Sequence, residues 1–199
     1  MNDDNITSAD VGGRARVDML ILSAPSKALE VARAIRHPWY RCQSLSKVAE
    51  HWGTLKQRMD IFLEALDVAQ TQTDINRIVT VSAWPLKVMH PLATDIASKY
   101  VITLVNQANN EPHTLRRANA LFTLAAALQD SKLLLQLIMP SLERALLGGH
   151  GWRIDRLIRF TTDMVKNSMP EVLETLVAHH SEGRKKQLLI ASLNQLKPT

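Results

Sequence analysis

Apolar residues recur along this 199-residue chain with the spacing of amphipathic helices, in segments separated by prolines and glycines. Pairs of these segments repeat about every 35–40 residues. The first two copies show the period best: Ala-Leu-Glu-Val-Ala at 28–32 lies nine residues before Arg41, and Ala-Leu-Asp-Val-Ala at 65–69 lies eight residues before Arg77. Such a period is typical of stacked helical hairpins, in which each pair of helices buries its apolar face on its neighbours.

The pattern predicts ten helices arranged as five hairpins. We expect the first helices at 26–36, 55–70, 94–107, 132–147 and 171–179. We expect the second helices at 39–52, 74–90, 113–129, 152–167 and 184–196. Pro85 and Pro140 lie inside predicted helices, which they should kink or break. Residues 1–17 have little to bury and include Gly12 and Gly13, so we expect a flexible tail there and a single repeat domain over 18–199.

A basic residue recurs in the second helix of each predicted hairpin, at Arg41, Arg77, Arg117, Arg156 and Lys186. The fourth residue after each of these is apolar, at Leu45, Val81, Leu121, Phe160 and Ile190. The fifth is small in four of the five copies. An apolar position followed by a small one suits a helix that packs closely on its neighbour.

This pattern resembles the HEAT-like family of α-α repeats over about residues 23–197. In that family a basic residue recurs in the second helix, and the second helices line the concave face of a superhelix. The resemblance implies an all-α, right-handed superhelix of about five hairpins, and it implies no activity. In the last copy Lys186 replaces arginine and the spacing shortens, so we expect an atypical terminal repeat there.

The composition favours a soluble all-α protein. Hydrophobic residues make up 46% of the chain, but only 5% are aromatic, and leucine and alanine dominate the apolar residues. A single cysteine, Cys42, excludes an intrachain disulfide and a cysteine-rich zinc site, and we expect it to be a small buried residue. No apolar run approaches the roughly 20 residues of a membrane span. The first five residues are polar and acidic, unlike a secretory signal, so we expect a cytoplasmic location.

The positive charge is concentrated in the predicted second helices. The formal net charge of the chain is +5. The segments 39–52, 74–90, 112–130, 151–167 and 183–197 together hold 14 Lys and Arg against 5 Asp and Glu. If these helices line the inner face of a superhelix, that face is basic. It would attract an acidic peptide, an acidic protein surface or a phosphate backbone.

The repeated arginines could bind a partner, or they could form an intramolecular ladder with neighbouring turns, as charges at one position of a repeat often do. The basic residues outside the ladder are better binding candidates. In the helix predicted at 152–167, Arg153 and Arg156 share a face with Asp163, opposite Ile154, Leu157 and Thr161. Trp39 and Trp152 each begin a helix, where a tryptophan either packs on the preceding turn or anchors a partner. The candidate binding residues are Trp39, Arg116, Trp152, Arg153, Arg156, Arg159, Lys166 and Lys185.

Motifs for catalysis or for a cofactor are missing from the sequence. It has no phosphate-binding glycine loop and no His-Glu-x-x-His, and the adjacent His179 and His180 would point about 100° apart on a helix. We therefore predict no metal, cofactor or catalytic residue. HEAT-like folds do include DNA glycosylases, which need tryptophans and a carboxylate in a basic groove. Trp152 and Asp155 place a tryptophan and a carboxylate three residues apart on one helix face, with Arg156 and Arg159 nearby, but Asp155 could equally pair with Arg159 one turn later.

Three hypotheses follow from the sequence. The favoured one is a non-catalytic HEAT-like scaffold or adaptor that binds a protein or an acidic partner on a basic concave face. The alternative is a repeat protein that binds nucleic acid through the same basic helices. An enzyme similar to a DNA glycosylase is the least favoured.

Overall fold

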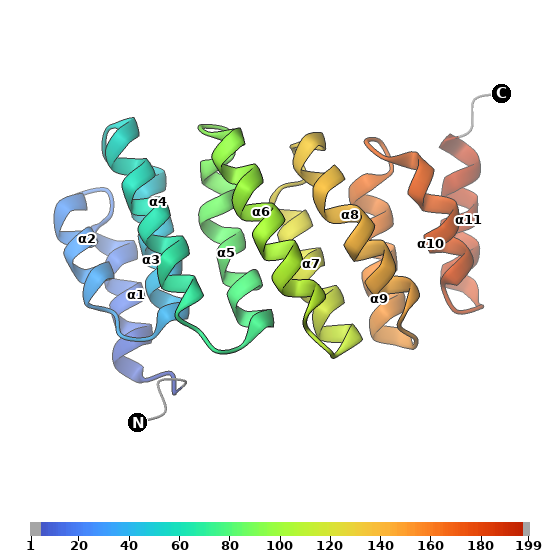
Figure 1. The fold of residues 1–199 in the computed structure, drawn as a ribbon, viewed down its shortest axis with the longest axis horizontal. Helices are drawn as coiled ribbons and strands as arrows, with labels where there is room; N and C mark the ends of the chain where they lie inside the picture. Colours follow the sequence, from blue (N-terminus) through green and yellow to red (C-terminus); the bar gives the residue numbers. More distant parts are fainter. Residues whose placement is uncertain (1–4, 197–199) are drawn as a thin grey trace. The chain divides into compact units, whose positions relative to one another are not determined.

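The computed structural model of this chain describes residues 5–196, with side chains to Asn194, and this part of the chain is helical without a strand (Figure 1). The helices are α1 (Ser8–Leu20), α2 (Pro25–Ala34), α3 (Pro38–His51), α4 (Leu55–Gln70), α5 (Ile75–Met89), α6 (Thr94–Asn109), α7 (Thr114–Ala127), α8 (Lys132–Leu147), α9 (Trp152–Val165), the short 3-10 helix η1 (Pro170–Val172), α10 (Leu173–His179) and α11 (Arg184–Leu196). The predicted all-α class is confirmed. Among the described residues, none of the helices has the length and apolar content needed to cross a membrane.

The ten predicted helices are present, and each end lies within two residues of its predicted position. Local capping explains part of this agreement. The Thr54 hydroxyl accepts the N–H of Gln57 before α4, and the Gln57 side chain accepts the N–H of Thr54 in return. Neither Pro85 nor Pro140 breaks its helix, so that part of the prediction is wrong. Each proline removes one hydrogen bond, and the buried apolar faces of α5 and α8 hold the helices together.

An eleventh helix, α1, occupies most of the segment that the sequence predicts as a flexible tail. Thr7 and Asp10 form a capping box, in which the Thr7 hydroxyl accepts the N–H of Asp10 and the Asp10 carboxylate accepts the N–H of Thr7. Val17 and Ile21 are buried, and α1 packs on α2 and α3. The expected tail is therefore wrong for residues 8–17, while residues 1–4 lie outside the described part of the chain.

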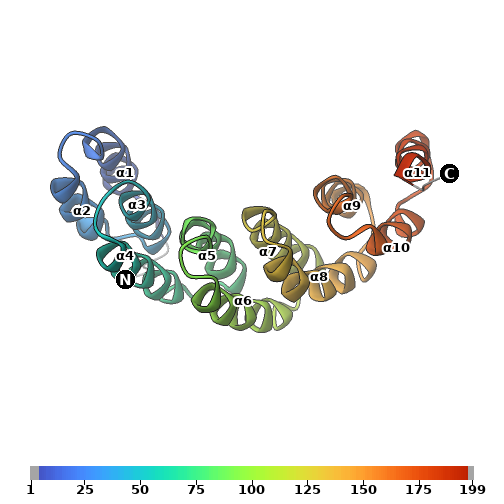
Figure 2. The same ribbon diagram turned by 90° about the horizontal axis from the view of Figure 1, so that it is seen from above.

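The chain divides into two compact units, Met1–Tyr100 and Val101–Thr199, and the single repeat domain over 18–199 stays a prediction. In the first unit α3 packs on α1, α2, α4 and α5, and α1, α3 and α5 lie on one side with α2 and α4 on the other (Figure 2). In the second unit α7 packs on α8 and α9, and α10 packs on α8, α9 and α11. Contacts thus join helices that are close in the sequence, an arrangement that requires no single core.

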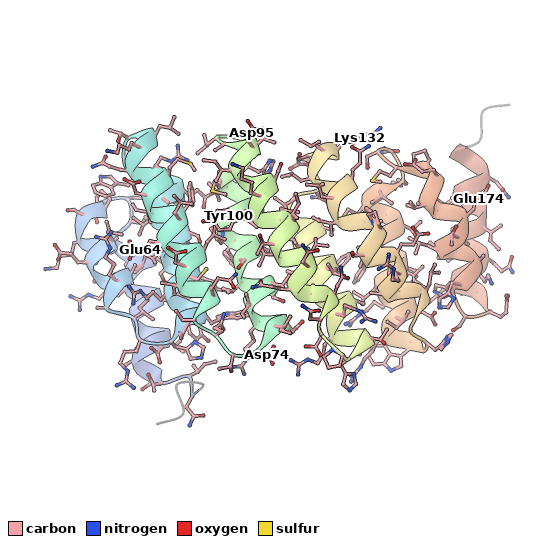
Figure 3. All side chains as sticks on the ribbon, in the orientation of Figure 1. Glu64, Asp74, Asp95, Tyr100, Lys132 and Glu174 are labelled. Atoms are coloured by element: carbon pink, nitrogen blue, oxygen red, sulfur yellow. The ribbon has the colours of Figure 1, made fainter. Side chains whose placement is uncertain are left out.

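One partly exposed carboxylate on α4 interacts with both α2 and α3. Glu64, labelled in Figure 3, accepts hydrogen bonds from the Arg33 guanidinium of α2, with an Nη2–Oε2 distance of 2.7 Å. Its other oxygen lies 3.6 Å from Nη2 of Arg41 on α3. Arg41 therefore has an intramolecular partner, which lies on a neighbouring helix and not in a turn. These groups are partly exposed, so the pairs add little to the free energy of unfolding.

The residue four positions after the predicted basic residue is buried in α3, α5 and α7 but exposed in α9. Leu45, Val81 and Leu121 are fully buried, whereas Phe160 is 47% exposed. In α9 the buried residues follow Arg153, not Arg156: Ile154, Leu157 and Ile158 are almost completely buried. The basic position of this helix therefore lies about one turn earlier than predicted.

We predict that Asp10→Ala lowers the free energy of unfolding by about 1–2 kcal/mol near neutral pH, because α1 loses its cap. The hydrogen bond from the Thr7 hydroxyl, with the backbone N–H of His37, outweighs burial and lowers the pKa of Asp10 to about 2. This stabilisation is complete above the unfolded-chain pKa of about 3.9 and is lost as the pH falls towards about 2. Urea unfolding across this range, with Glu30→Ala as the control for an exposed carboxylate, tests both effects.

Candidate binding surface on helix α9

The start of α9 is set by a tight glycine-containing turn. Gly151, the residue before the helix, has a φ of 92°, in the left-handed region that favours glycine. Gly149 lies so close to Ile154 that a Cβ atom would come within 2.8 Å of that side chain. The turn therefore packs directly on the buried face of α9, and it leaves Trp152, the first residue of the helix, 66% exposed.

Helix α9 has one buried and one exposed face, as the sequence predicts. Ile154, Leu157 and Thr161 are buried. Arg153 and Arg156 are exposed on the opposite side, and the side chain of Asp163 is 69% exposed. The confirmed pattern places both arginines on the solvent side of the helix.

Aromatic and cationic side chains meet on this exposed face. The guanidinium carbons of Arg153 and Arg156 lie 5.3 Å and 5.5 Å from the centroid of the Trp152 ring, within the range of a cation–π interaction. Farther along the helix, Phe160 stacks on Phe122 of α7, with ring centroids 6.1 Å apart. We call these five residues the α9 surface. Trp152 does not bury its ring on the preceding turn, which was one of its two predicted roles.

The arginines of α9 have no acidic partner among the described residues. No ion pair joins a carboxylate to Arg153, Arg156 or Arg159 within that part of the chain, and the buried Nε of Arg159 has no hydrogen-bond acceptor there. Lys166 is different, because its Nζ lies 3.9 Å from Asp163. The exposed guanidinium groups of Arg153 and Arg156 are thus available to an anionic partner.

Two other predicted binding residues, Arg116 and Trp39, are engaged within the fold. The Nε of Arg116 lies 3.3 Å from the carboxylate of Glu111, which is buried in the turn before α7. The same carboxylate accepts the N–H of His113, and Arg117 donates to the Glu111 carbonyl oxygen. In the first unit, the Trp39 side chain is half-buried, and the backbone N–H of Trp39 donates to His37 Nδ1. Arg116 therefore compensates a buried charge, which makes it a poor binding residue.

Lys185 is the remaining candidate, and it is exposed near the start of α11. The sequence missed Phe122 and Phe160 as surface residues, since both read as ordinary buried positions of a repeat. It also missed the role of Glu111. The only available signal was its position immediately before Pro112, where a side chain often accepts backbone N–H groups of a turn.

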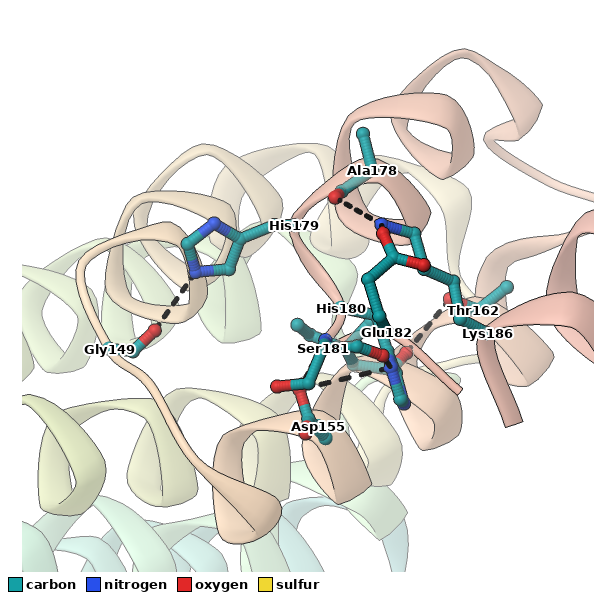
Figure 4. A network of polar contacts seen from close by, with 10 residues as sticks. Gly149, Asp155, Thr162, Ala178, His179, His180, Ser181, Glu182 and Lys186 are labelled. Atoms are coloured by element: carbon teal, nitrogen blue, oxygen red, sulfur yellow. Dashed lines mark hydrogen bonds and ion pairs between the residues drawn. The ribbon is translucent and has the colours of Figure 1, made fainter. Parts of the chain in front are cut away.

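Asp155, the one carboxylate considered for catalysis, belongs to a polar network at the end of α10 (Figure 4). Its Oδ1 accepts the N–H of Ser181 at 3.1 Å and lies 3.9 Å from Nδ1 of His180. That Nδ1 lies 2.7 Å from the Ser181 carbonyl oxygen, so it carries a proton and donates it there. Nearby, His179 Nε2 lies 2.9 Å from the carbonyl oxygen of Gly149.

The network gives Asp155 a structural role. Burial acts to raise its pKa, but the hydrogen bonds from Ser181 and the attraction of His180 and His179 outweigh burial, so the pKa lies below its ordinary value. A carboxylate that stays ionised and accepts a backbone N–H stabilises a turn and is a poor general base. Asp155 therefore bonds across to the turn after α10 and not to Arg159, the partner that helical spacing suggested.

The described part of the chain offers no metal centre or reactive thiol. Within it, no group of three or more histidine, cysteine, aspartate or glutamate side chains could hold a metal ion. Cys42 is buried, as predicted, and burial raises the pKa of its thiol far above the ordinary range. Comparisons of the chain with protein-family models, with curated proteins and with solved structures gave no match. The site must therefore be interpreted from its own chemistry.

We predict that Asp155→Ala lowers the free energy of unfolding by about 1–2 kcal/mol, because the N–H of Ser181 loses its acceptor. Hydrogen exchange at the Ser181 amide should become faster, and urea unfolding should report the loss of stability. Asp163→Ala removes an exposed carboxylate from the same helix and should change neither measurement. Equal effects of the two substitutions would contradict the structural role of Asp155.

Proposed function

We propose that this chain is a non-catalytic α-α repeat module that binds an acidic segment of a partner protein on the α9 surface. The observation that carries the proposal is the group of unpaired arginines around the exposed ring of Trp152. Tryptophan and arginine are enriched among the residues that supply most of the energy of protein interfaces. An exposed tryptophan stabilises the folded chain little, so its exposure favours a role in binding.

The stacked arginines suit carboxylate groups in particular. A guanidinium that lies against an aromatic ring keeps its in-plane N–H groups free for a bidentate hydrogen bond. Arg153 and Arg156 can therefore each receive a carboxylate while Trp152 contacts an apolar side chain between them. The stacked Phe160 and Phe122 rings extend the apolar part of the surface along α9.

An acidic protein segment explains this surface better than a nucleic acid does. Binding to a phosphate backbone depends on many cations that follow the strand. Arg116 and Arg117 are held by Glu111, and Lys186 by Glu182 and the Ala178 carbonyl oxygen, so the basic charge of these helices is partly consumed. The cations of α9 form a small patch beside exposed aromatic rings, which matches a short peptide.

The HEAT-like architecture remains part of the proposal. It is supported by the ten helices at their predicted positions and by contacts between helices that are near in the sequence. In a superhelix of this kind, α7 and α9 would belong to the second helices that line the concave face. A cytoplasmic location stays a prediction from the sequence.

Charge reversal on α9 tests the proposed partner. We predict that Arg153→Glu with Arg156→Glu weakens binding of a fluorescent peptide of glutamates and phenylalanines by roughly tenfold or more, since each arginine loses a charged hydrogen bond. Fluorescence anisotropy measures the dissociation constant. Lys27→Glu with Lys132→Glu changes the net charge equally at exposed positions on α2 and α8, so it should leave the affinity unchanged.

A labelled DNA duplex serves as the competing ligand in the same assay. Tighter binding of the duplex than of the peptide, with a steep loss of affinity as salt is added, would support the nucleic-acid alternative. Equal losses in the α9 variant and the control variant would show that only the net charge matters. Either result would contradict the proposal.

Trp152 allows binding and stability to be measured separately. We predict that Trp152→Ala changes the free energy of unfolding by less than about 0.5 kcal/mol, because the ring is exposed. The same substitution should weaken peptide binding by roughly tenfold, the behaviour of an interface anchor. Urea unfolding and anisotropy measure the two quantities. A large loss of stability would show instead that the ring supports the fold.

A further inference from the structure

A groove between α1 and α2 has no part in the function proposed above. Its volume is about 650 Å³, within the usual range of small-molecule sites. The apolar side chains of Val31 and Ile35 line it from the α2 side, and Gly12 and Gly13 line it from α1. Arg16 and Arg36 complete the lining with two exposed cations.

The two glycines of α1 have different explanations. A Cβ atom on Gly13 would lie 2.9 Å from the Ile35 side chain, so close packing of the two segments requires glycine there. A Cβ atom on Gly12 would meet no atom within 4 Å. Glycine inside a helix is unfavourable, and Gly12 gains no closer packing in return. Its effect is to keep this wall of the groove free of a side chain, which suits the close approach of a ligand.

The charges around the groove favour an anion. Neither Arg16 nor Arg36 has a carboxylate partner among the described residues. Asp10 also lines the groove, but its oxygens accept hydrogen bonds from the N–H and hydroxyl of Thr7 and from the N–H of His37. Asp10 stays ionised, but these internal donors occupy its oxygens, and the two arginines outnumber it, so the lining keeps a net positive charge that favours an anionic group.

We propose that this groove binds a small molecule that joins a carboxylate to an apolar chain, as a medium-chain fatty acid does. The carboxylate lies between Arg16 and Arg36, and the chain lies over Gly12 on the apolar floor of Val31 and Ile35. An inorganic anion would leave that floor uncovered. An uncharged lipid would leave both guanidinium groups without a partner.

Isothermal titration calorimetry with decanoate tests the proposal on the full chain, below the concentration at which decanoate forms micelles. We expect saturable binding with one decanoate per chain. Decanol has the same apolar chain without the charge and should bind at least roughly tenfold more weakly, because it makes no charged hydrogen bond. Equal affinities for the two compounds would overturn the role of the arginines.

Three variants locate the site. Arg16→Glu with Arg36→Glu should weaken decanoate binding by roughly tenfold or more. Gly12→Leu fills the open wall and should abolish binding, while Gly12→Ala keeps most of the space. Circular dichroism shows whether each variant remains helical, and Gly12→Ala should be at least as stable as the parent chain because alanine favours a helix.

Lys27→Glu with Lys132→Glu is the matched control, because it changes the net charge equally at two exposed cations that do not line the groove. It should leave decanoate binding unchanged. Loss of binding in this control would show that decanoate associates with the surface as a detergent, and the proposal would be wrong. Undiminished binding in the folded Gly12→Leu variant, or no binding to the parent chain, would overturn it as well. These outcomes do not depend on whether α9 binds a peptide.

Discussion

Each helix of this chain must bury its apolar face on helices that lie near it in the sequence, and the rest of the structure depends on this constraint. A helix of 10 to 16 residues, the length of most helices here, is marginal alone in water, so packing has to stabilise it. Helix α3 shows the result most clearly, because Cys42, Leu45 and Ala49 are fully buried between its neighbours. Only the outward-facing residues of such helices are left for function.

At three turns between helices, a carboxylate accepts a backbone N–H group. Asp10 accepts the N–H of His37, Glu111 accepts that of His113, and Asp155 accepts that of Ser181. Buried backbone N–H groups need such acceptors, because an unpaired donor is costly. These three carboxylates therefore stabilise the fold. Glu111 also pairs with Arg116, which removes Arg116 from the binding surface, and none of the three pairs with Arg153 or Arg156.

Sequence periodicity predicted the ten hairpin helices well because each has an amphipathic pattern and clear end signals, such as Thr54 with Gln57. It missed α1, because Gly12, Gly13 and the few apolar residues of 1–17 indicated a flexible tail and the capping box of Thr7 and Asp10 was overlooked. It also placed the basic position of α9 one turn too late, because arginines occur at 153, 156 and 159 and only burial distinguishes them. The predicted face of Arg153 and Arg156 was correct. The partner of Asp155 was not predictable, because Ser181 lies 26 residues away along the chain.

Residues that are unfavourable for folding at their position and gain no packing contact in exchange are the best guide to function here. Trp152 leaves two thirds of its surface in solvent, and Gly12 weakens a helix without making a contact. Beside each of them lie two arginines that no carboxylate of the described chain neutralises. A packed helical protein could lose all of these features without losing its core. This coincidence, once on α9 and once between α1 and α2, is the physical ground for proposing an anionic ligand at each surface.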